Sequence, residues 1–402
     1  MAKRPALGMV EFVLLFALVN CLVALGLDAL LPAMRMLEGA LNVSDPNRIQ
    51  LVIPIFILGA VFGEIIAGPL ADAYGRKVVI LVGLVIFCLG SIISMQASSL
   101  DQLLLGRIIQ GFGVSGPKIA SRAMIRDQYS GDAMARIMSF IFMIFILVPM
   151  IAPAIGQWAI GIAGWQAIFV MYLVTAGSGF IWLGLRQGET LPPEKKLPIS
   201  PATLAANIGL IVRNKQVVAY TISVGFVFGG VLNYLGTAQA IFFDVYDIDR
   251  QFPLYYAILA GGIGLAFFAN SQLVTRYGMH RLAFMALWGS IFFSLIMLFA
   301  AILYSGSPPF SLFMACGFCI FFCNGFLFGN LNTMAMDLMG RVAGLGASVV
   351  SSCSSLIGVG IALAIGPFYD QSVIPLYFGF LISGLVGVTL LTLSARLERA
   401  EV

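Results

Sequence analysis

Two ionisable residues stand inside long apolar stretches of the sequence, where a charge is costly. Asp28 lies within the first apolar stretch and Arg107 within the fourth. A charged side chain at the centre of a bilayer costs roughly 3 kcal/mol or more, so ionisable residues there usually serve a function. A carboxyl group in a poorly hydrated cavity favours its neutral form, whereas a nearby arginine favours its charged form. A carboxyl group poised between these effects can bind a proton in one conformation and release it in another.

We therefore expect Asp28 to be the proton-coupling residue and Arg107 to be its partner. Arginine keeps its proton in proteins, so Arg107 can only bias the carboxyl group or hold a substrate. Both residues are therefore also candidates for substrate binding. The alternative is a static ion pair that joins two helices.

A further charge extends the face that Arg107 defines. Arg107 and Lys118 are eleven residues apart, close to three helical turns, so they share one face of a helix. If that face lines a cavity, its positive charge suits anionic or zwitterionic substrates. Glu64 lies at a similar depth in the second apolar stretch. The alternative is therefore a structural ion pair between Glu64 and Lys118.

The other candidate substrate contacts are amide and aromatic side chains within apolar stretches. Aromatic rings with a few amides suit a mostly apolar, weakly specific pocket. Ordinary packing between helices is the alternative for each of them. These candidates are Asn20, Gln110, Phe226, Asn233, Tyr234, Gln239, Asn324 and Phe328.

The composition assigns the chain to the polytopic membrane proteins. It has 402 residues, of which 60% are hydrophobic and 10% charged, and its mean hydropathy is +1.01. Apolar stretches of about 20 residues, enough to cross a bilayer as a helix, recur along the whole chain. A transmembrane barrel is excluded, because barrel strands alternate apolar and polar residues and these stretches do not.

The stretches number about twelve and predict an all-α membrane protein with twelve transmembrane helices in two pseudo-symmetric six-helix bundles. A polar, proline-rich segment between the two halves has the composition of a linker. The predicted domains are therefore 1–186, a cytoplasmic linker at 187–213, and 214–402. With the N-terminus inside, most lysines and arginines fall in the inner connections, which predicts an inner-membrane protein with both termini in the cytoplasm.

Short motifs of the first half recur in the second half. Gln110-Gly111-Phe112 recurs as Asn324-Gly325-Phe326, and Tyr74-Gly75 recurs weakly as Tyr277-Gly278. These echoes occur in the same order at similar offsets. They therefore indicate a duplicated six-helix unit, which is the parallel-repeat plan of one class of transporters.

The turn between the second and third stretches is dense in charge. Acidic and basic residues sit at helix ends of the wrong polarity for the helix dipoles, so we do not expect helix capping to explain them. We expect instead a gating latch, with Arg76 and Lys77 paired to Asp127 or Asp132. Prolines bend a helix, so a pair one turn apart in the fifth stretch predicts a bent helix that limits leakage. The expected gating residues are Gly68, Asp72, Gly75, Arg76, Lys77, Pro149, Pro153 and Gly156.

These motifs resemble those of a known family. The stretch from Gly68 to Asp72, followed by Gly75-Arg76-Lys77, resembles the cytoplasmic loop 2–3 motif of the major facilitator superfamily. Residues 28–32, 105–111 and 149–156 resemble the bicyclomycin/chloramphenicol-type drug:proton antiporters, although Gln157 replaces a second glycine often found there.

The resemblance implies an antiporter that exports small organic molecules such as drugs, coupled to protons, by alternating access. It also favours the proton-carrying role of Asp28, because the family places a functional acid in that helix. The alternative function is transport of a specific metabolite, anionic or zwitterionic, through the face that carries Arg107 and Lys118.

Other classes of function find little support in the sequence. We find no catalytic residues, no phosphate-binding loop for ATP, and no cluster of metal ligands, since the six cysteines lie in apolar stretches and the only histidine is His280. We therefore expect neither an enzyme, nor a cofactor, nor a metal. The expected partners are a small-molecule substrate, protons and the lipid bilayer, without nucleic acid, and the protein is expected to be a monomer.

Overall fold

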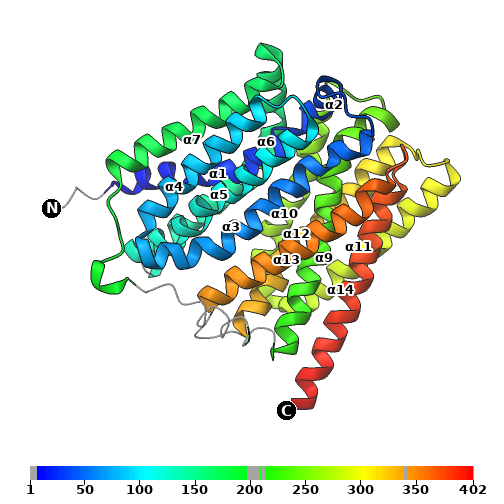
Figure 1. The fold of residues 1–402 in the computed structure, drawn as a ribbon. Coiled ribbons are helices and arrows are strands. Elements are labelled where there is room, and N and C mark those ends of the chain that lie inside the picture. The colour runs from blue at the N-terminus through cyan, green and yellow to red at the C-terminus, as the bar shows by residue number, and fades with distance from the viewer. Residues whose placement is uncertain (1–6, 130, 197–208, 210–212, 339–342, 402) are drawn as a thin grey trace. The chain divides into compact units, whose positions relative to one another are not determined.

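The computed structural model describes residues 7–129, 131–196, 209, 213–338 and 343–401, and within these ranges all regular structure is helical (Figure 1). The chain divides into two compact units, Met1–Ser200 and Pro201–Val402. Of the predicted linker, residues 187–196 belong to the first unit, and most of the remainder lies outside the described residues.

The first unit contains six long helices. They are α1 (Met9–Asp28), α3 (Val52–Tyr74), α4 (Arg76–Met95), α5 (Leu100–Gln128), α6 (Gly131–Ala163) and α7 (Gln166–Arg186). Shorter elements join or follow them: η1 (Leu31–Ala33), α2 (Met34–Ala40), η2 (Pro46–Leu51) and η3 (Pro193–Lys195).

The second unit also contains six long helices among its described residues. They are α9 (Lys215–Ala240), α10 (Phe252–Tyr277), α11 (Met279–Leu303), α12 (Phe310–Asp337), α13 (Ala343–Ile365) and α14 (Ile374–Glu401). A π-helical turn, η4 (Ile241–Val245), extends α9, and a 3-10 turn, η6 (Gly366–Phe368), follows α13.

The twelve long helices confirm the predicted fold class. Among the described residues, ten spans are long and apolar enough to cross a membrane, and α6 contains a shorter apolar segment, Leu147–Ala163. At 29 residues α5 is long enough to span a bilayer, but Arg107, Lys118 and Arg122 make it less apolar than its neighbours. Its charges must therefore be accommodated inside the protein.

The first span, Met9–Ala40, contains Asp28 well inside it but is not one regular helix. Asp28 is the last residue of α1, and the chain continues through η1 and α2. Pro32 lies four residues later and has no N–H with which to bond the carbonyl of Asp28. Asp28 therefore stands at a break in the span, where the regular ladder of backbone hydrogen bonds ends.

Glycines bring the helices of the first unit into close contact with α5. A Cβ atom placed on Gly111 would lie 1.9 Å from the carbonyl oxygen of Phe56 on α3, and one on Gly113 would lie 2.4 Å from the backbone nitrogen of Phe87 on α4. Small residues at helix contacts are typical of membrane proteins, because they let backbones approach closely. This packing fixes the position of the polar side chains of α5.

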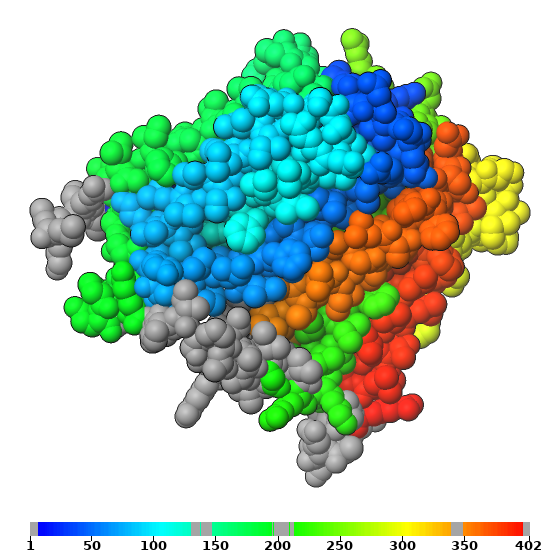
Figure 2. Space-filling view, in the orientation of Figure 1, coloured from blue at the N-terminus to red at the C-terminus, as the bar shows by residue number. Residues whose placement is uncertain are grey.

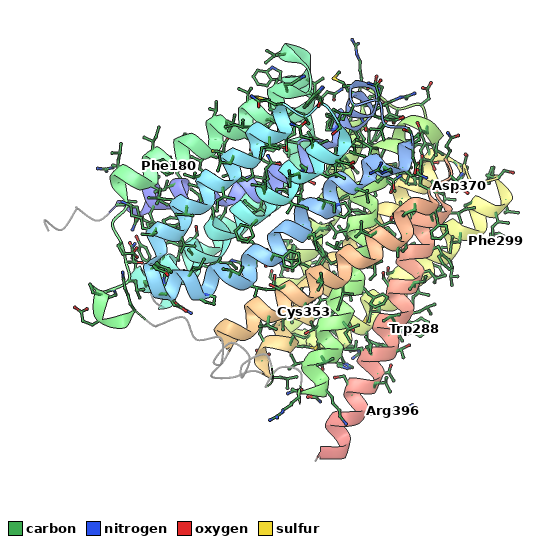
Figure 3. The ribbon with its side chains drawn as sticks, in the orientation of Figure 1. Phe180, Trp288, Phe299, Cys353, Asp370 and Arg396 are labelled. Carbon is green, nitrogen blue, oxygen red and sulfur yellow. The ribbon has the colours of Figure 1, made fainter. Side chains whose placement is uncertain are left out.

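The outer faces of the helices are apolar. The helix α4 lies on the face drawn in Figure 2 and exposes the large apolar side chains of Val78, Val82, Val85 and Leu89. In the second unit, Trp288 and Phe299 of α11 likewise project from their helix (Figure 3). Such continuous apolar surface is rare on soluble monomers and is the surface expected of lipid-facing helices.

We expect Gly111→Ala to lower the stability of the protein by about 1–3 kcal/mol, because the added methyl group overlaps the Phe56 carbonyl and forces α3 away from α5. Thermal unfolding of the purified protein in detergent measures the effect. The matched control is Gly177→Ala on α7, where the added methyl group meets no atom within 4 Å. Equal melting temperatures for the two variants would contradict the close-packing argument.

Candidate functional site

Arg107 is the most deeply buried cation among the described residues, with an exposed fraction of 0%. Its Nε donates to the carbonyl oxygen of Val52 at 3.2 Å, its Nη2 to that of Gly26 at 2.6 Å, and its Nη1 to Oε1 of Gln110 at 2.9 Å. Its guanidinium also lies 4.3 Å from the ring centroid of Phe56. These contacts hold one positive charge rigidly between α1, α3 and α5.

Asp28 lies at the same end of α1 as the carbonyl group that Arg107 binds. The Asp28 residue is 4% exposed. Tyr172 of α7 donates its hydroxyl to the carbonyl oxygen of Leu25 at 2.9 Å and interacts electrostatically with both Asp28 and Arg107. Arg107 thus binds the backbone of the helix that carries Asp28, and Tyr172 lies within the field of both charges.

The motif at residues 149–156, which lies within α6, contacts the end of α1. A Cβ atom on Gly156 of α6 would lie 1.9 Å from the carbonyl oxygen of Ala29, the residue that follows Asp28. Pro149 and Pro153 both lie inside α6, where each removes a backbone donor. The contact of Gly156 therefore joins α6 to the break after α1, so a movement of α6 would alter the surroundings of Asp28.

A hydrogen-bonded chain extends from Arg107 to α4. Gln110, itself fully buried, donates from Nε2 to Oγ of Ser91 at 2.7 Å, and Ser91 donates to the carbonyl oxygen of Phe87 at 2.8 Å. Neither Ser91 nor Tyr172 was predicted from the sequence to belong to the site. A single polar residue in an apolar stretch was the only sequence signal for Ser91, and many such residues merely bond their own helix.

Asn20 is a polar residue that bonds its own helix. Its Nδ2 donates to the carbonyl oxygen of Phe16 at 2.7 Å, one turn earlier in α1. The bond satisfies part of its amide within the helix itself, which agrees with the packing alternative considered for this residue.

The two deep charges Glu64 and Lys118 form an ion pair between α3 and α5. The side chain of Glu64 is 2% exposed and that of Lys118 is 21% exposed. Arg122, one turn further along α5, also interacts electrostatically with Glu64. The positive charge of Lys118 is therefore neutralised within the first unit.

The charged turn between α3 and α4 contains a network centred on Arg76, which is 4% exposed. Arg76 forms ion pairs with Asp72 and with Asp127, the latter with 3.2 Å between Nε and Oδ2. Lys77 instead donates from Nζ to the carbonyl oxygen of Gly184 at 2.8 Å. The predicted pairing of Arg76 with Asp127 is thus present, whereas the side chain of Asp132 lies outside the described residues.

A carboxylate from outside this turn caps α4, which the sequence did not predict. The two oxygens of Glu189 accept hydrogen bonds from the backbone N–H groups of Arg76 and Lys77, each at 3.0 Å. The turn residue Gly75 has φ of 117°, and a Cβ there would lie 2.4 Å from Oε2 of Glu189. Glycine therefore permits both the turn and the approach of the carboxylate.

The start of the linker is docked on this turn. Thr190 donates its hydroxyl to Oδ2 of Asp127 at 3.1 Å, and Lys196 donates from Nζ to the carbonyl oxygen of Tyr74 at 3.2 Å. With Glu189, these contacts tie residues 189–196 to the ends of α3, α4 and α5.

In the second unit, two predicted amides are buried without full hydrogen bonding to described residues. Asn233 and Asn324 are each 2% exposed. Both polar atoms of Asn233, and Nδ2 of Asn324, have no such partner. A Cβ on Gly379 would lie 3.4 Å from Nδ2 of Asn233, so this amide faces α14.

The predicted aromatic residues of this unit form ring contacts. Tyr234 stacks on Tyr256 at 5.9 Å between centroids and meets the ring of Phe321 edge-on at 4.8 Å. Phe328 packs edge-on against Phe228, which the sequence analysis did not single out, at 6.2 Å. The remaining candidates are the half-buried Phe226 and the buried Gln239.

A hydrogen bond between two amides, one of them the candidate Asn330, was not predicted from the sequence. Asn330 of α12 donates from Nδ2 to Oδ1 of Asn270 on α10 at 2.8 Å. No spacing rule links residues of two different helices, so the sequence carried no signal for this pair.

A family model described as Major Facilitator Superfamily matches residues 16–363. The chain belongs to this superfamily. The resemblance inferred from the charged turn is therefore confirmed over most of the chain.

Curated relatives within the superfamily include proteins named for drug resistance. The bicyclomycin resistance protein homolog of Haemophilus influenzae is 26% identical over 369 residues, covering 91% of this chain and 92% of that protein. The multidrug resistance protein MdtL of Salmonella paratyphi C is 25% identical over 251 residues, covering 61% of this chain and 62% of its own length.

Solved structures of the superfamily share the fold. A D-xylose-proton symporter superposes with a TM-score of 0.76 at 15% identity, covering 96% of this chain and 97% of its own. The human organic anion transporter MFSD10 superposes with a TM-score of 0.68 at 16% identity, covering 97% and 100%. The protein is thus a multi-pass membrane transporter of this superfamily, whose members are not enzymes.

We expect Lys118→Met to destabilise the protein by about 3–5 kcal/mol, because it leaves the buried carboxylate of Glu64 without this counter-charge. The double variant Glu64→Gln/Lys118→Met removes both charges and should recover most of the loss. Thermal unfolding of the single and double variants makes the comparison. A single variant as stable as the parent protein would show that the pair does not stabilise the fold.

We expect Glu189→Ala to cost about 1 kcal/mol, the usual effect of losing a helix cap, and to speed proteolysis between residues 187 and 196. The control is Glu194→Ala, an exposed carboxylate five residues later that makes no hydrogen bond to a described residue. Limited proteolysis followed by mass spectrometry locates the cuts. Equal cleavage of both variants would refute the capping role.

Proposed function

We propose that the protein is a proton-coupled antiporter that exports small organic molecules such as drugs by alternating access. The observation that carries the proposal is the position of Asp28: a residue 4% exposed, at a break in the first span, two residues after the Gly26 carbonyl that binds Arg107. The relatives named for bicyclomycin and multidrug resistance support the class of substrate.

The proposed coupling follows from which groups can change charge. Arg107 remains protonated and is held by two backbone carbonyls and Gln110, so its charge is constant. Asp28 can be charged or neutral. Water access would favour the carboxylate, and a drier environment would favour the protonated acid. Proton uptake and release at Asp28 would therefore follow the opening and closing of the surrounding helices.

The helix α6 is the element best placed to make that environment change. Gly156 allows α6 to contact the Ala29 carbonyl, directly after Asp28. We propose that a shift of α6 along this contact exposes or shields the carboxyl group. The Arg76 network would act as the latch of the same cycle, closed by Asp72, Asp127 and Glu189 and opened when those bonds break.

Transport of an anionic metabolite is less well supported. That function needs the charge of Lys118 to be available to a substrate, and Glu64 neutralises it. The observed ion pair therefore favours the drug-export proposal over the alternative.

The test is ligand-driven proton release from the purified protein, comparing the parent protein with Asp28→Asn across cationic, neutral and anionic compounds. We expect ligands to release protons from the parent protein and not from Asp28→Asn, because the asparagine has no proton to exchange. The matched control is Asp101→Asn, an exposed carboxylate paired with Arg48, which should behave as the parent protein does.

Equal proton release from the parent protein and Asp28→Asn would overturn the coupling role of Asp28. Release driven by anions alone would overturn the drug-export proposal in favour of the metabolite alternative.

A further inference from the structure

A cavity of about 480 Å³ with polar and apolar lining residues lies within the second unit, at the turn between α10 and α11. The ends of four helices meet there: the start of α9, the end of α10, the start of α11 and the end of α12. The lining residues that matter here are Tyr220, Tyr277, Gly278, His280, Arg281 and Asp337. None of them takes part in the proposed proton site.

The cavity occupies the place that corresponds, in the internal repeat, to the capped turn of the first unit. Gly75 precedes α4 with φ of 117° and ψ of 151°, and Gly278 precedes α11 with φ of 77° and ψ of 154°. A tyrosine precedes each glycine, and a long helix follows each. The two turns therefore present the first backbone N–H groups of a helix in a similar way.

The two turns differ in what meets those N–H groups. In the first unit the chain folds back after α7, and the carboxylate of Glu189 accepts both bonds. In the second unit α14 continues as a helix to Glu401, and no described side chain caps α11. A Cβ atom on Gly278 would have no atom within 4 Å, whereas a Cβ atom on Gly75 would lie 2.4 Å from Oε2 of Glu189.

Buried polar groups of the cavity also lack partners among the described residues. Tyr220 is 6% exposed, and its hydroxyl forms no hydrogen bond with them. Nε2 of His280 is fully buried, also without such a bond. The unsatisfied buried Nε2 of His280 destabilises the protein. A ligand that accepts hydrogen bonds would recover part of that cost.

The charge around the cavity is positive on balance. Arg276 and Arg281 lie on the ring of Tyr277, at 5.4 Å and 5.8 Å from its centroid, and neither forms an ion pair with a described residue. Asp337 is the acidic residue of the lining and offsets one of these two charges. The start of α11 adds the partial positive charge of a helix N-terminus.

We propose that this cavity binds a small oxyanion, a carboxylate or a phosphate, against the first turn of α11. The anion would take the place that Glu189 takes in the first unit, with Arg281 and Tyr220 as further donors. Charge-assisted bonds of this kind are among the strongest in proteins. The site is separate from the proton site, and its absence would leave the proposed antiport standing.

Isothermal titration of the full-length protein in detergent with inorganic phosphate, and separately with acetate, tests the site. We expect saturable binding of one anion. Arg281→Gln should weaken it at least tenfold and Tyr220→Phe several-fold. The matched control is Arg396→Gln on α14, an exposed arginine that does not line the cavity (Figure 3), which should bind as the parent protein does.

Two results would overturn the proposal: no saturable binding of either anion, or equal weakening by Arg281→Gln and Arg396→Gln, which would reveal only diffuse charge. Nanodiscs distinguish the source of the anion. Competition with phosphate by phosphatidylglycerol, and not by phosphatidylcholine, would identify a lipid headgroup, whereas undiminished phosphate binding in both lipids would identify a free anion. Either of these outcomes supports an anion site.

Discussion

A positive charge that is buried away from water needs hydrogen-bond acceptors around it. The helices of the first unit pack so that backbone carbonyls supply these acceptors to Arg107. Arg107 has no exposed surface, and two of its three hydrogen bonds go to carbonyl oxygens of α1 and α3. The Val52 carbonyl reaches the guanidinium because α3 and α5 touch through Gly111. A larger residue at this contact would separate the helices and leave a buried charge poorly solvated.

Two other cations of the first unit are compensated by carboxylates. Lys118 is neutralised by Glu64 within the helix bundle, and Arg76 is neutralised by two aspartates at the end of the bundle. Arg107 instead donates its hydrogen bonds to neutral acceptors, two backbone carbonyls and Gln110.

The internal repeat shows how one backbone turn can be completed in two ways. Gly75 and Gly278 adopt similar conformations before long helices. The chain supplies its own carboxylate to the first turn and none of its described carboxylates to the second. The difference arises after α7 and α14, because one helix ends and lets the chain fold back whereas the other continues. The two turns thus share a backbone conformation and differ in the groups that meet their N–H groups.

The sequence by itself determined the twelve spans, the family and the residues that bear charge, because apolar length and the cost of burying ions are properties of local composition. It also allowed the Glu64–Lys118 pair to be anticipated from matched depth. The tertiary structure alone decided the partners of Arg107, the contact of Gly156 with Ala29, and the capping of α4 by Glu189, 113 residues away. Such contacts depend on how helices cross and where the chain folds back, and neither is encoded in any single stretch.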